Sequence, residues 1–159
     1  MTDIRNQVLT NHTKALPDKV LGFFFDYRAL SNFHIEPFTW SDVIWNCSEN
    51  AYQAAKTDRS DWPRFAAMTP SEARKEGQKV HLRKDWEQVK ISVMTEICQA
   101  KFTQCPIAKK CLLNSKQAHL EESTWWKDQF WGTYKGNGRN ELGKILMTIR
   151  SQLQGEVDV

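Results

Sequence analysis

The sequence predicts an α+β fold: a single compact domain, mostly helical, with a small β-sheet near its N-terminal part. Apolar residues recur at helical spacing between about residues 85 and 104 and again after residue 140. Short apolar and aromatic runs lie between residues 21 and 45, where they indicate strands. The length of 159 residues and the 40% apolar content suit one domain with a real core.

The expected domain boundaries follow from where this patterning starts and stops. Residues 1–19 have little periodicity, and Pro17 marks the expected start of the ordered fold. We therefore expect an N-terminal extension over 1–19, the domain over 20–154, and a C-terminal tail over 155–159.

The strands are expected early in the chain. Residues 21–25 have the pattern of a buried strand, and residues 28–33 that of a loop. Residues 38–41 and 43–45 are short strand candidates around a turn at Ser41-Asp42. Later, residues 120–126 suggest a strand or an extended segment.

Helices dominate the rest of the chain. Ser48 is a candidate N-cap for a helix over 49–56. Thr69-Pro-Ser-Glu combines a threonine cap, a proline at N1 and a glutamate at N3, which predicts a helix from there to about Gly77. The longest helix is expected over about 85–104, and Pro106 starts another. A last helix from near residue 140 has an apolar face formed by Leu142, Ile145, Leu146, Ile149 and Leu153.

Composition limits the classes of partner. The net charge of +3 is compatible with a nucleotide or nucleic-acid partner but too weak to argue for one. No apolar run approaches the roughly 20 residues of a membrane span, and the N-terminus lacks a signal-peptide core, so we expect a soluble, cytoplasmic protein without membrane contact. The four cysteines form no CxxC pair and the histidines show no metal-ligand spacing, so no metal and no cofactor are expected.

A glycine-rich stretch, residues 127–146, leads from an acid and a tryptophan into the last helix. Gly132, Gly136 and Gly138 permit positive φ or close approach to a ligand. Such a loop before a helix N-terminus can hold an anion such as phosphate, with Lys135 and Arg139 adding charge. It can equally be a tight turn that starts a packing helix.

Several charged residues allow both a structural and a catalytic interpretation. Glu49 and Lys56 are seven residues apart and lie on one face of the expected helix. They could form a surface ion pair, or Glu49 could be an acid/base carboxylate beside a nucleophilic Lys56 amine. Lys101 lies near an apolar stripe, either snorkelling to solvent or partly desolvated with a lowered pKa. Lys90 lies near the same stripe.

Two further pairs, each made of a charged residue and a nearby tryptophan, also allow two interpretations. Arg83 and Trp86 could hold a phosphate and stack on a base or sugar, or be a solvated residue and a core residue. Asp128 near Trp131 could activate water or stabilise a cationic sugar, or cap a turn.

Taken in order, these motifs resemble one family. They begin with Leu-Ser-Asn-Phe at 30–33, Ser-Glu-Asn-Ala-Tyr-Gln-Ala-Ala-Lys at 48–56 and Asp-Trp at 85–86. Lys-Phe at 101–102, Phe-Trp-Gly at 130–132 and Gly-Arg-Asn-Glu-Leu-Gly-Lys-Ile-Leu-Met at 138–147 complete them. Over roughly residues 20–153 the chain resembles the NADAR, or YbiA-like, family.

The resemblance implies an N-glycosidase that cleaves the bond between a ribose and a base or amino group. One branch of the family acts on ribosylamino-pyrimidine phosphates of early riboflavin biosynthesis, and another removes ADP-ribose from guanine in nucleic acid. A non-catalytic module that binds ADP-ribose or modified nucleic acid is the alternative. Three departures leave the branch open: Asn50 where many members have histidine, Gln78 where arginine is frequent, and Cys105 where asparagine is frequent.

The resemblance also implies the site. Glu49 is the leading acid/base, with Asp128 as its carboxylate partner and Lys56 or Lys101 as a nucleophile that would form an imine. The expected substrate-binding positions are Arg28, Asn32, Phe33, Arg83, Trp86, Trp131, Gly132, Gly138 and Asn140. Among these, the two tryptophans would sandwich the base or sugar, and the arginines and the glycine loop would receive phosphate.

Overall fold

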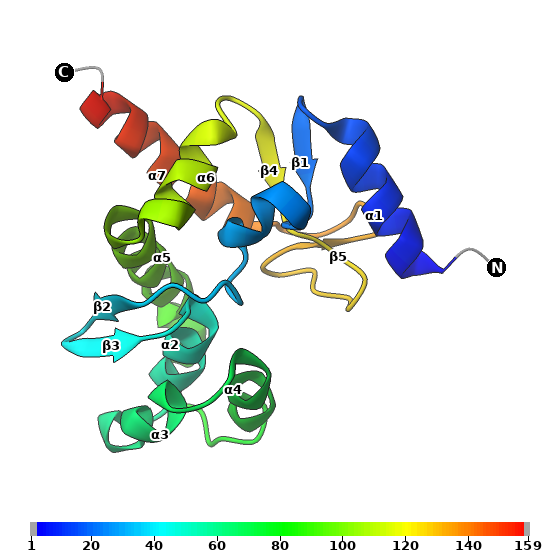
Figure 1. Cartoon of the computed structure of the whole chain (residues 1–159). Helices are drawn as coiled ribbons and strands as arrows, with labels where there is room; N and C mark the ends of the chain where they lie inside the picture. The colour runs from blue at the N-terminus through cyan, green and yellow to red at the C-terminus, as the bar shows by residue number, and fades with distance from the viewer. Residues whose placement is uncertain (1–2, 158–159) are drawn as a thin grey trace. The chain divides into compact units, whose positions relative to one another are not determined.

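The computed structural model describes residues 3–157 and shows a mostly helical α+β chain with small two-stranded sheets (Figure 1). Its residues fall into two compact units. The first unit contains the chain up to Ser31 and from Lys110 onward, and the second contains Asn32–Lys109. The expected fold class is therefore confirmed, although the strands form three separate pairs within the described residues rather than one small sheet.

The first unit is built on a parallel strand pair. Its elements are α1 (Ile4–Ala15), β1 (Lys19–Leu21), η1 (Phe25–Leu30), β4 (His119–Glu121), β5 (Ser123–Thr124), β6 (Thr133–Tyr134) and α7 (Glu141–Val157). β1 pairs with β4 so that Val20 lies opposite Leu120, and both side chains are fully buried. β5 pairs with β6 in the same parallel sense. α1 packs on β1 and α7 on β4. α6 (Pro106–Asn114) begins in the second unit and ends in the first.

The helix α1 was not expected, because residues 1–19 lack a clear apolar period. It begins after Asp3, whose carboxylate accepts the Arg5 amide, and it buries only Val8 and His12. The His12 ring nitrogen Nδ1 lies 3.1 Å from the Leu21 carbonyl. Contacts with β1 rather than a long apolar stripe therefore hold α1 in place.

The strand predicted over 21–25 is displaced. β1 ends at Leu21 because Gly22 adopts a φ of 91° and its amide donates to the Glu121 carbonyl, which closes the ladder. Phe25, expected inside, is 66% exposed, and the loop predicted over 28–33 begins within the 3-10 helix η1. An apolar run alone did not reveal the turn that the glycine makes.

The second unit is organised around one buried helix. Its strands β2 (Phe38–Trp40) and β3 (Val43–Trp45) form the expected hairpin, and Ser41 and Asp42 both have the positive φ of a tight two-residue turn. Its helices are α2 (Ser48–Ala55), η2 (Arg59–Asp61), α3 (Trp62–Ala66), α4 (Pro70–Gly77) and α5 (Trp86–Gln104). All eight residues of α2 are buried, and α3, α4 and α5 pack against it (Figure 1).

The helix starts were predicted with mixed success. At α4 the capping box is confirmed: the Thr69 hydroxyl accepts the Glu72 amide, and the Glu72 carboxylate accepts the Thr69 amide. At α2 the expected cap is wrong, because Ser48 is the first helical residue and Cys47 occupies the cap position; the Cys47 thiol donates to Oδ1 of Asn50 and accepts no backbone amide of the helix. The predicted apolar face of α7 is buried at all five positions. No helix within residues 3–157 is long and apolar enough to cross a membrane.

Candidate active site

The buried helix α2 carries the leading catalytic candidate, Glu49. This carboxylate is 8% exposed, and its Oε1 accepts a hydrogen bond of 2.9 Å from Nε2 of Gln53, one helical turn further on. The Glu49 amide donates to the Asn32 carbonyl at 3.0 Å. The Asn32 side chain contacts the Met94 sulfur at 3.7 Å. Helix and preceding loop together fix the position of the Glu49 backbone.

Lys56 lies at the C-terminal end of the same helix. Its Nζ is 5.3 Å from the centre of the Tyr52 ring. Burial lowers the pKa of the Lys56 amine, Glu49 opposes this shift, and the cations Lys90 and Arg74 add to it. A lowered pKa makes the neutral, nucleophilic amine more abundant at any given pH.

Lys101 on α5 is buried rather than snorkelling. It is 1% exposed, and its Nζ lies 4.8 Å from the centre of the Phe102 ring. Glu49 and Lys101 both act electrostatically on the Cys47 thiol, the first raising and the second lowering its pKa, so the structure brings the carboxylate and this lysine into one neighbourhood. Of the two sequence readings of Lys101, the structure supports the desolvated one.

Two buried cysteines, Cys98 and Cys105, have thiols of low reactivity. Desolvation raises the pKa of Cys98 to about 12 and that of Cys105 to about 11, and the nearby Lys101 offsets only part of this. A thiol with so high a pKa is a poor nucleophile at neutral pH. Cys105, which departs from the family pattern, contacts the carbonyls of Glu36 and Pro37.

Within the second unit Trp86 is a core residue, and Arg83 is exposed and paired with Asp85. Trp86 is 4% exposed, and its ring centre lies 5.3 Å from that of Tyr52. The Arg83 guanidinium donates to both oxygens of Asp85, at 2.6 and 2.8 Å, which raises the pKa of Arg83. The Arg83 amide also donates to the Lys56 carbonyl, so the segment before α5 is tied to the end of α2.

Phe33 lies in the same unit and is half-buried. The centre of its ring is 5.7 Å from the guanidinium carbon of Arg74 on α4. Arg28 belongs to the first unit, where its guanidinium donates to the Ser31 hydroxyl at 3.2 Å.

In the first unit, Asp128 shapes the start of the glycine loop. Its Oδ1 accepts the amides of Phe130 and Trp131 at 3.1 and 2.9 Å. This is a side-chain-capped turn, one of the two sequence readings of Asp128. The Trp131 ring packs edge-on against the Phe130 ring, with 4.8 Å between centres.

The glycine loop is held by backbone contacts. The first amides of α7, at Glu141 and Leu142, donate to the carbonyls of Phe130 and Trp131. A Cβ at Gly132 would come within 2.1 Å of the Glu122 carbonyl oxygen. Those two α7 amides are therefore engaged in a tight turn, which is the packing reading of this stretch.

Asn140 closes that turn. It has a φ of 53°, its Oδ1 accepts the Glu122 amide, and its Nδ2 donates to the Leu120 carbonyl, both at 3.0 Å. Gly138 has a φ of 151°, and a Cβ there would lie 2.4 Å from the Gly132 carbonyl. Both positions have positive φ, and Gly138 is also closely packed.

The predicted site residues thus divide between the units. Glu49, Lys56, Lys101, Trp86, Arg83, Asn32 and Phe33 belong to the second unit, and Arg28, Asp128, Trp131, Gly132, Gly138 and Asn140 to the first. The predicted pair of Glu49 and Asp128 draws one carboxylate from each unit.

Sequence reasoning missed two polar residues of α2. Gln53 was seen only as part of a motif, although its spacing of four from Glu49 puts both on one helix face. Asn50 is fully buried, and its Nδ2 donates to the carbonyls of Phe65 and Met68 at 2.8 and 2.7 Å. The asparagine that departs from the family pattern therefore ties α2 to the end of α3.

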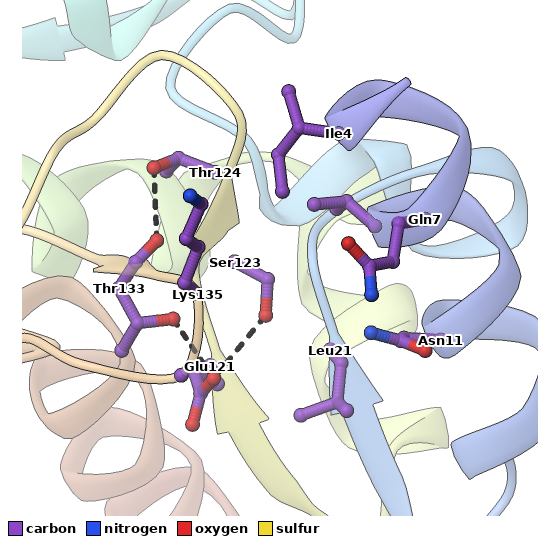
Figure 2. A pocket seen from close by; sticks show the side chains of 11 residues that line it. Ile4, Gln7, Asn11, Leu21, Glu121, Ser123, Thr124, Thr133 and Lys135 are labelled. Carbon is purple, nitrogen blue, oxygen red and sulfur yellow. Dashed lines mark hydrogen bonds between the residues drawn. The ribbon is translucent and has the colours of Figure 1, made fainter. Parts of the chain in front are cut away.

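A separate pocket lies in the first unit. It has a volume of about 550 Å³ and is lined by α1, β1 and residues of the β4–β6 region (Figure 2). The hydroxyls of Ser123 and Thr133 donate to Oε2 of Glu121 at 3.2 and 2.8 Å. The pocket lining includes none of the predicted catalytic residues, and these polar groups bond with one another.

Across residues 3–157, no cluster of three or more His, Cys, Asp or Glu side chains is placed to hold a metal ion.

Known proteins give this geometry a context. The model of the NADAR domain matches residues 23–154. The chain is 33% identical to the N-glycosidase YbiA of Escherichia coli over 146 residues, which cover 87% of this chain and 91% of that protein. It is 37% identical to a riboflavin biosynthesis protein of Vibrio vulnificus, over 87% of this chain and 37% of that protein. The NMR structure of E. coli YbiA superposes with a TM-score of 0.76 at 34% identity, over 87% of each chain. The chain therefore belongs to the NADAR family, as an N-glycosidase of the YbiA type.

Proposed function

We propose that this N-glycosidase hydrolyses the bond between a phosphorylated ribose and a base or amino-pyrimidine, with Glu49 as the acid/base. The observation that carries the proposal is a buried, hydrogen-bonded carboxylate near two buried or half-buried lysines, one of which has a lowered pKa. Candidate substrates are ribosylamino-pyrimidine phosphates and ADP-ribosylated guanine in nucleic acid. Relatives named as riboflavin biosynthesis proteins in Vibrio vulnificus and Zea mays favour the first.

The reaction needs a negative charge near the sugar, a proton for the departing nitrogen, and a water or amine that attacks C1′. As the bond between C1′ and nitrogen breaks, its electrons go to the nitrogen, which must gain a proton, while positive charge grows on the sugar. An ionised Glu49 stabilises that charge, takes a proton from the attacking water and passes it to the departing nitrogen. Asp128 and the predicted ligand residues of the first unit remain part of the proposal through the family resemblance.

A covalent route is the second way to the same products. The neutral amine of a lysine attacks C1′, and the base leaves with the bonding electrons and gains the proton that the amine loses. The ring C–O bond at C1′ then breaks, and the opened sugar remains as an imine that water hydrolyses. Lys56 is half-buried whereas Lys101 is 1% exposed, so Lys56 is the amine that a substrate reaches more readily.

A binding module without activity is the weaker alternative. Recognition of ADP-ribose does not require a buried carboxylate or a desolvated amine. Burying either group costs stability, so a role in catalysis is the simpler explanation for the presence of both. The relatives named N-glycosidase also favour an enzyme.

Replacing Glu49 tests the proposal. Glu49→Gln keeps the shape but removes the charge, so we expect kcat to fall by about 10²–10⁴-fold with the circular dichroism spectrum unchanged. Glu156→Gln, an exposed change on α7, is the matched control and should leave kcat unaltered. Turnover by Glu49→Gln close to that of the unmodified protein would refute the assignment.

A two-substrate assay separates the candidate reactions. The protein is incubated with a ribosylamino-pyrimidine phosphate and, separately, with ADP-ribosylated guanine in DNA. Release of ribose phosphate or of ADP-ribose identifies the branch, and binding of either probe without release supports the module instead.

A further inference from the structure

We propose that Gln53 is a positioning residue that holds the Glu49 carboxylate ionised and oriented, and that Gly77 on α4 is a glycine in order to make room for the Gln53 amide. The inference rests on the proposed role of Glu49 and adds two residues to the site.

The side chains of Gln53 and Glu49 are joined by a buried hydrogen bond. Nε2 of Gln53 donates to Oε1 of Glu49 at 2.9 Å, and the residues are 5% and 8% exposed. Both lie on one face of α2, whose eight residues are all buried. A donor aimed at a carboxylate in such a place favours its charged form.

The Gln53 amide is oriented with Nε2 toward Glu49 and Oε1 away from it. If the amide were reversed, its Oε1 would face a carboxylate oxygen and the two would repel each other, so Nε2 must point to Glu49 while that group is ionised. Oε1 then points the other way, is buried, and has no hydrogen-bond partner within the described part of the chain. Because an unsatisfied buried acceptor is unfavourable, fold stability alone does not explain a glutamine here.

Gly77 of α4 lies directly against the Gln53 amide. A Cβ built on Gly77 would lie 1.8 Å from Oε1 of Gln53 and 2.5 Å from its Cδ. Gly77 does not have the positive φ that is recorded for Gly22, so its backbone would accept other residues. The space occupied by the Gln53 amide is thus the reason for a glycine at this position.

Other charged groups around Glu49 stay constant in the test. Glu49 interacts electrostatically with Cys47 and Lys56, and these two groups in turn feel Lys101, Lys90 and Arg74 on α5 and α4. Each is retained when Gln53 is replaced, so a change in titration reports the lost hydrogen bond.

The experiment replaces Gln53 by methionine, which has similar length and no donor. We expect the acidic limb of the kcat profile to move up by about one pH unit, since a hydrogen bond to a charged group has about that effect. On the acidic side of the limb kcat should then be about tenfold lower, with KM nearly unchanged. The carboxyl ¹³C signal of Glu49, followed by NMR without substrate, should shift its titration midpoint in the same direction.

Gly77→Ala tests the second half of the inference. It should move the pH limb in the same direction as Gln53→Met, and adding it to Gln53→Met should cause little further movement, because the two changes act through one hydrogen bond. Gly155→Ala on α7, where an added Cβ meets nothing within 4 Å, is the control and should leave the profile unchanged.

The outcomes are distinguishable. An unmoved NMR midpoint in folded Gln53→Met refutes the role of Gln53, whatever the enzyme does. An active Glu49→Gln refutes the proposed function, whatever the midpoint does. If Gly77→Ala lowers the melting temperature but leaves the midpoint unmoved, the glycine serves packing only and that half of the inference is wrong.

Discussion

At the scale of single residues, the active-site candidates differ most from an ordinary core in their burial. Glu49, Gln53 and Lys101 are each at most 8% exposed, and burial lowers the pKa of Lys56. Buried ionisable groups are costly unless they have partners. Gln53 is such a partner for Glu49, and this makes the pair a better functional candidate than a surface ion pair would be.

Lys56 supplies a prediction about pH. Because its folded-state pKa lies below the ordinary 10.5, the neutral amine forms as pH rises through that lowered value. If Lys56 is the nucleophile, activity should rise with pH and level off below pH 10.5. Borohydride reduction during turnover should then add the mass of the opened sugar to Lys56, as detected by mass spectrometry of the digested protein.

The controls for this prediction are two arginine substitutions. Lys56→Arg keeps a positive charge but forms no imine, so it should abolish both the adduct and most activity. Lys75→Arg, exposed on α4, should change neither. Full turnover without any adduct would instead favour direct attack by water. The same pKa shift means that protonated Lys56 opposes folding at neutral pH, and this effect fades as pH rises above its folded-state pKa.

At the scale of elements, α2 holds the reactive groups and its neighbours hold α2. Asn50 fastens it to the end of α3, Gly77 of α4 lies against Gln53, and the Asn32 carbonyl accepts the amide of Glu49. A change in any of these elements should therefore be felt at the carboxylate.

The capping box of α4 gives a prediction at this scale. Thr69→Ala removes the hydroxyl that accepts the Glu72 amide, which should cost about 1 kcal/mol of unfolding free energy in urea titrations. Ser71→Ala, an exposed change two residues on, should be neutral or slightly stabilising because alanine is the better helix former. Equal stability of Thr69→Ala and the unmodified protein would show that the cap contributes little.

At the scale of the whole molecule, the family region and the described fold do not begin together. The NADAR match starts at residue 23, whereas the structure already has α1 at Ile4–Ala15 and β1 at Lys19–Leu21. This arrangement suggests that α1 supports the first unit without taking part in the reaction.

Val8 tests that division. Val8→Ala shortens a buried side chain of α1 and should cost about 1–2 kcal/mol, which corresponds to a drop of roughly 2–8 °C in melting temperature. We expect kcat and KM at 25 °C to remain within twofold of their original values. Leu9→Ala, a less buried neighbour, should lower the melting temperature less. A large loss of kcat in folded Val8→Ala would give α1 a direct role.

Much of the fold was accessible from periodicity and local signals. The helices α4 and α5 and the hairpin β2–β3 begin and end within about a residue of their expected positions, and α6 and α7 begin at or next to theirs. The helix α7 continues to Val157, into the segment expected to be a C-terminal tail. These elements have strong apolar faces, a capping box, or prolines at their starts. The elements that were not expected are α1, which lacks an apolar period, and the short η1, η2, α3 and β6, and these depend on what packs against them.

The sequence by itself determined the fold class, the main helices and, through ordered motifs, the family. Only the tertiary structure decided which polar residues are buried and what they touch. Whether Lys101 snorkels, whether Asp128 caps a turn, and why position 77 is a glycine all depend on residues distant in sequence. Local spacing sets the face of a helix on which a side chain lies, but only packing sets the solvent and the partners that side chain has.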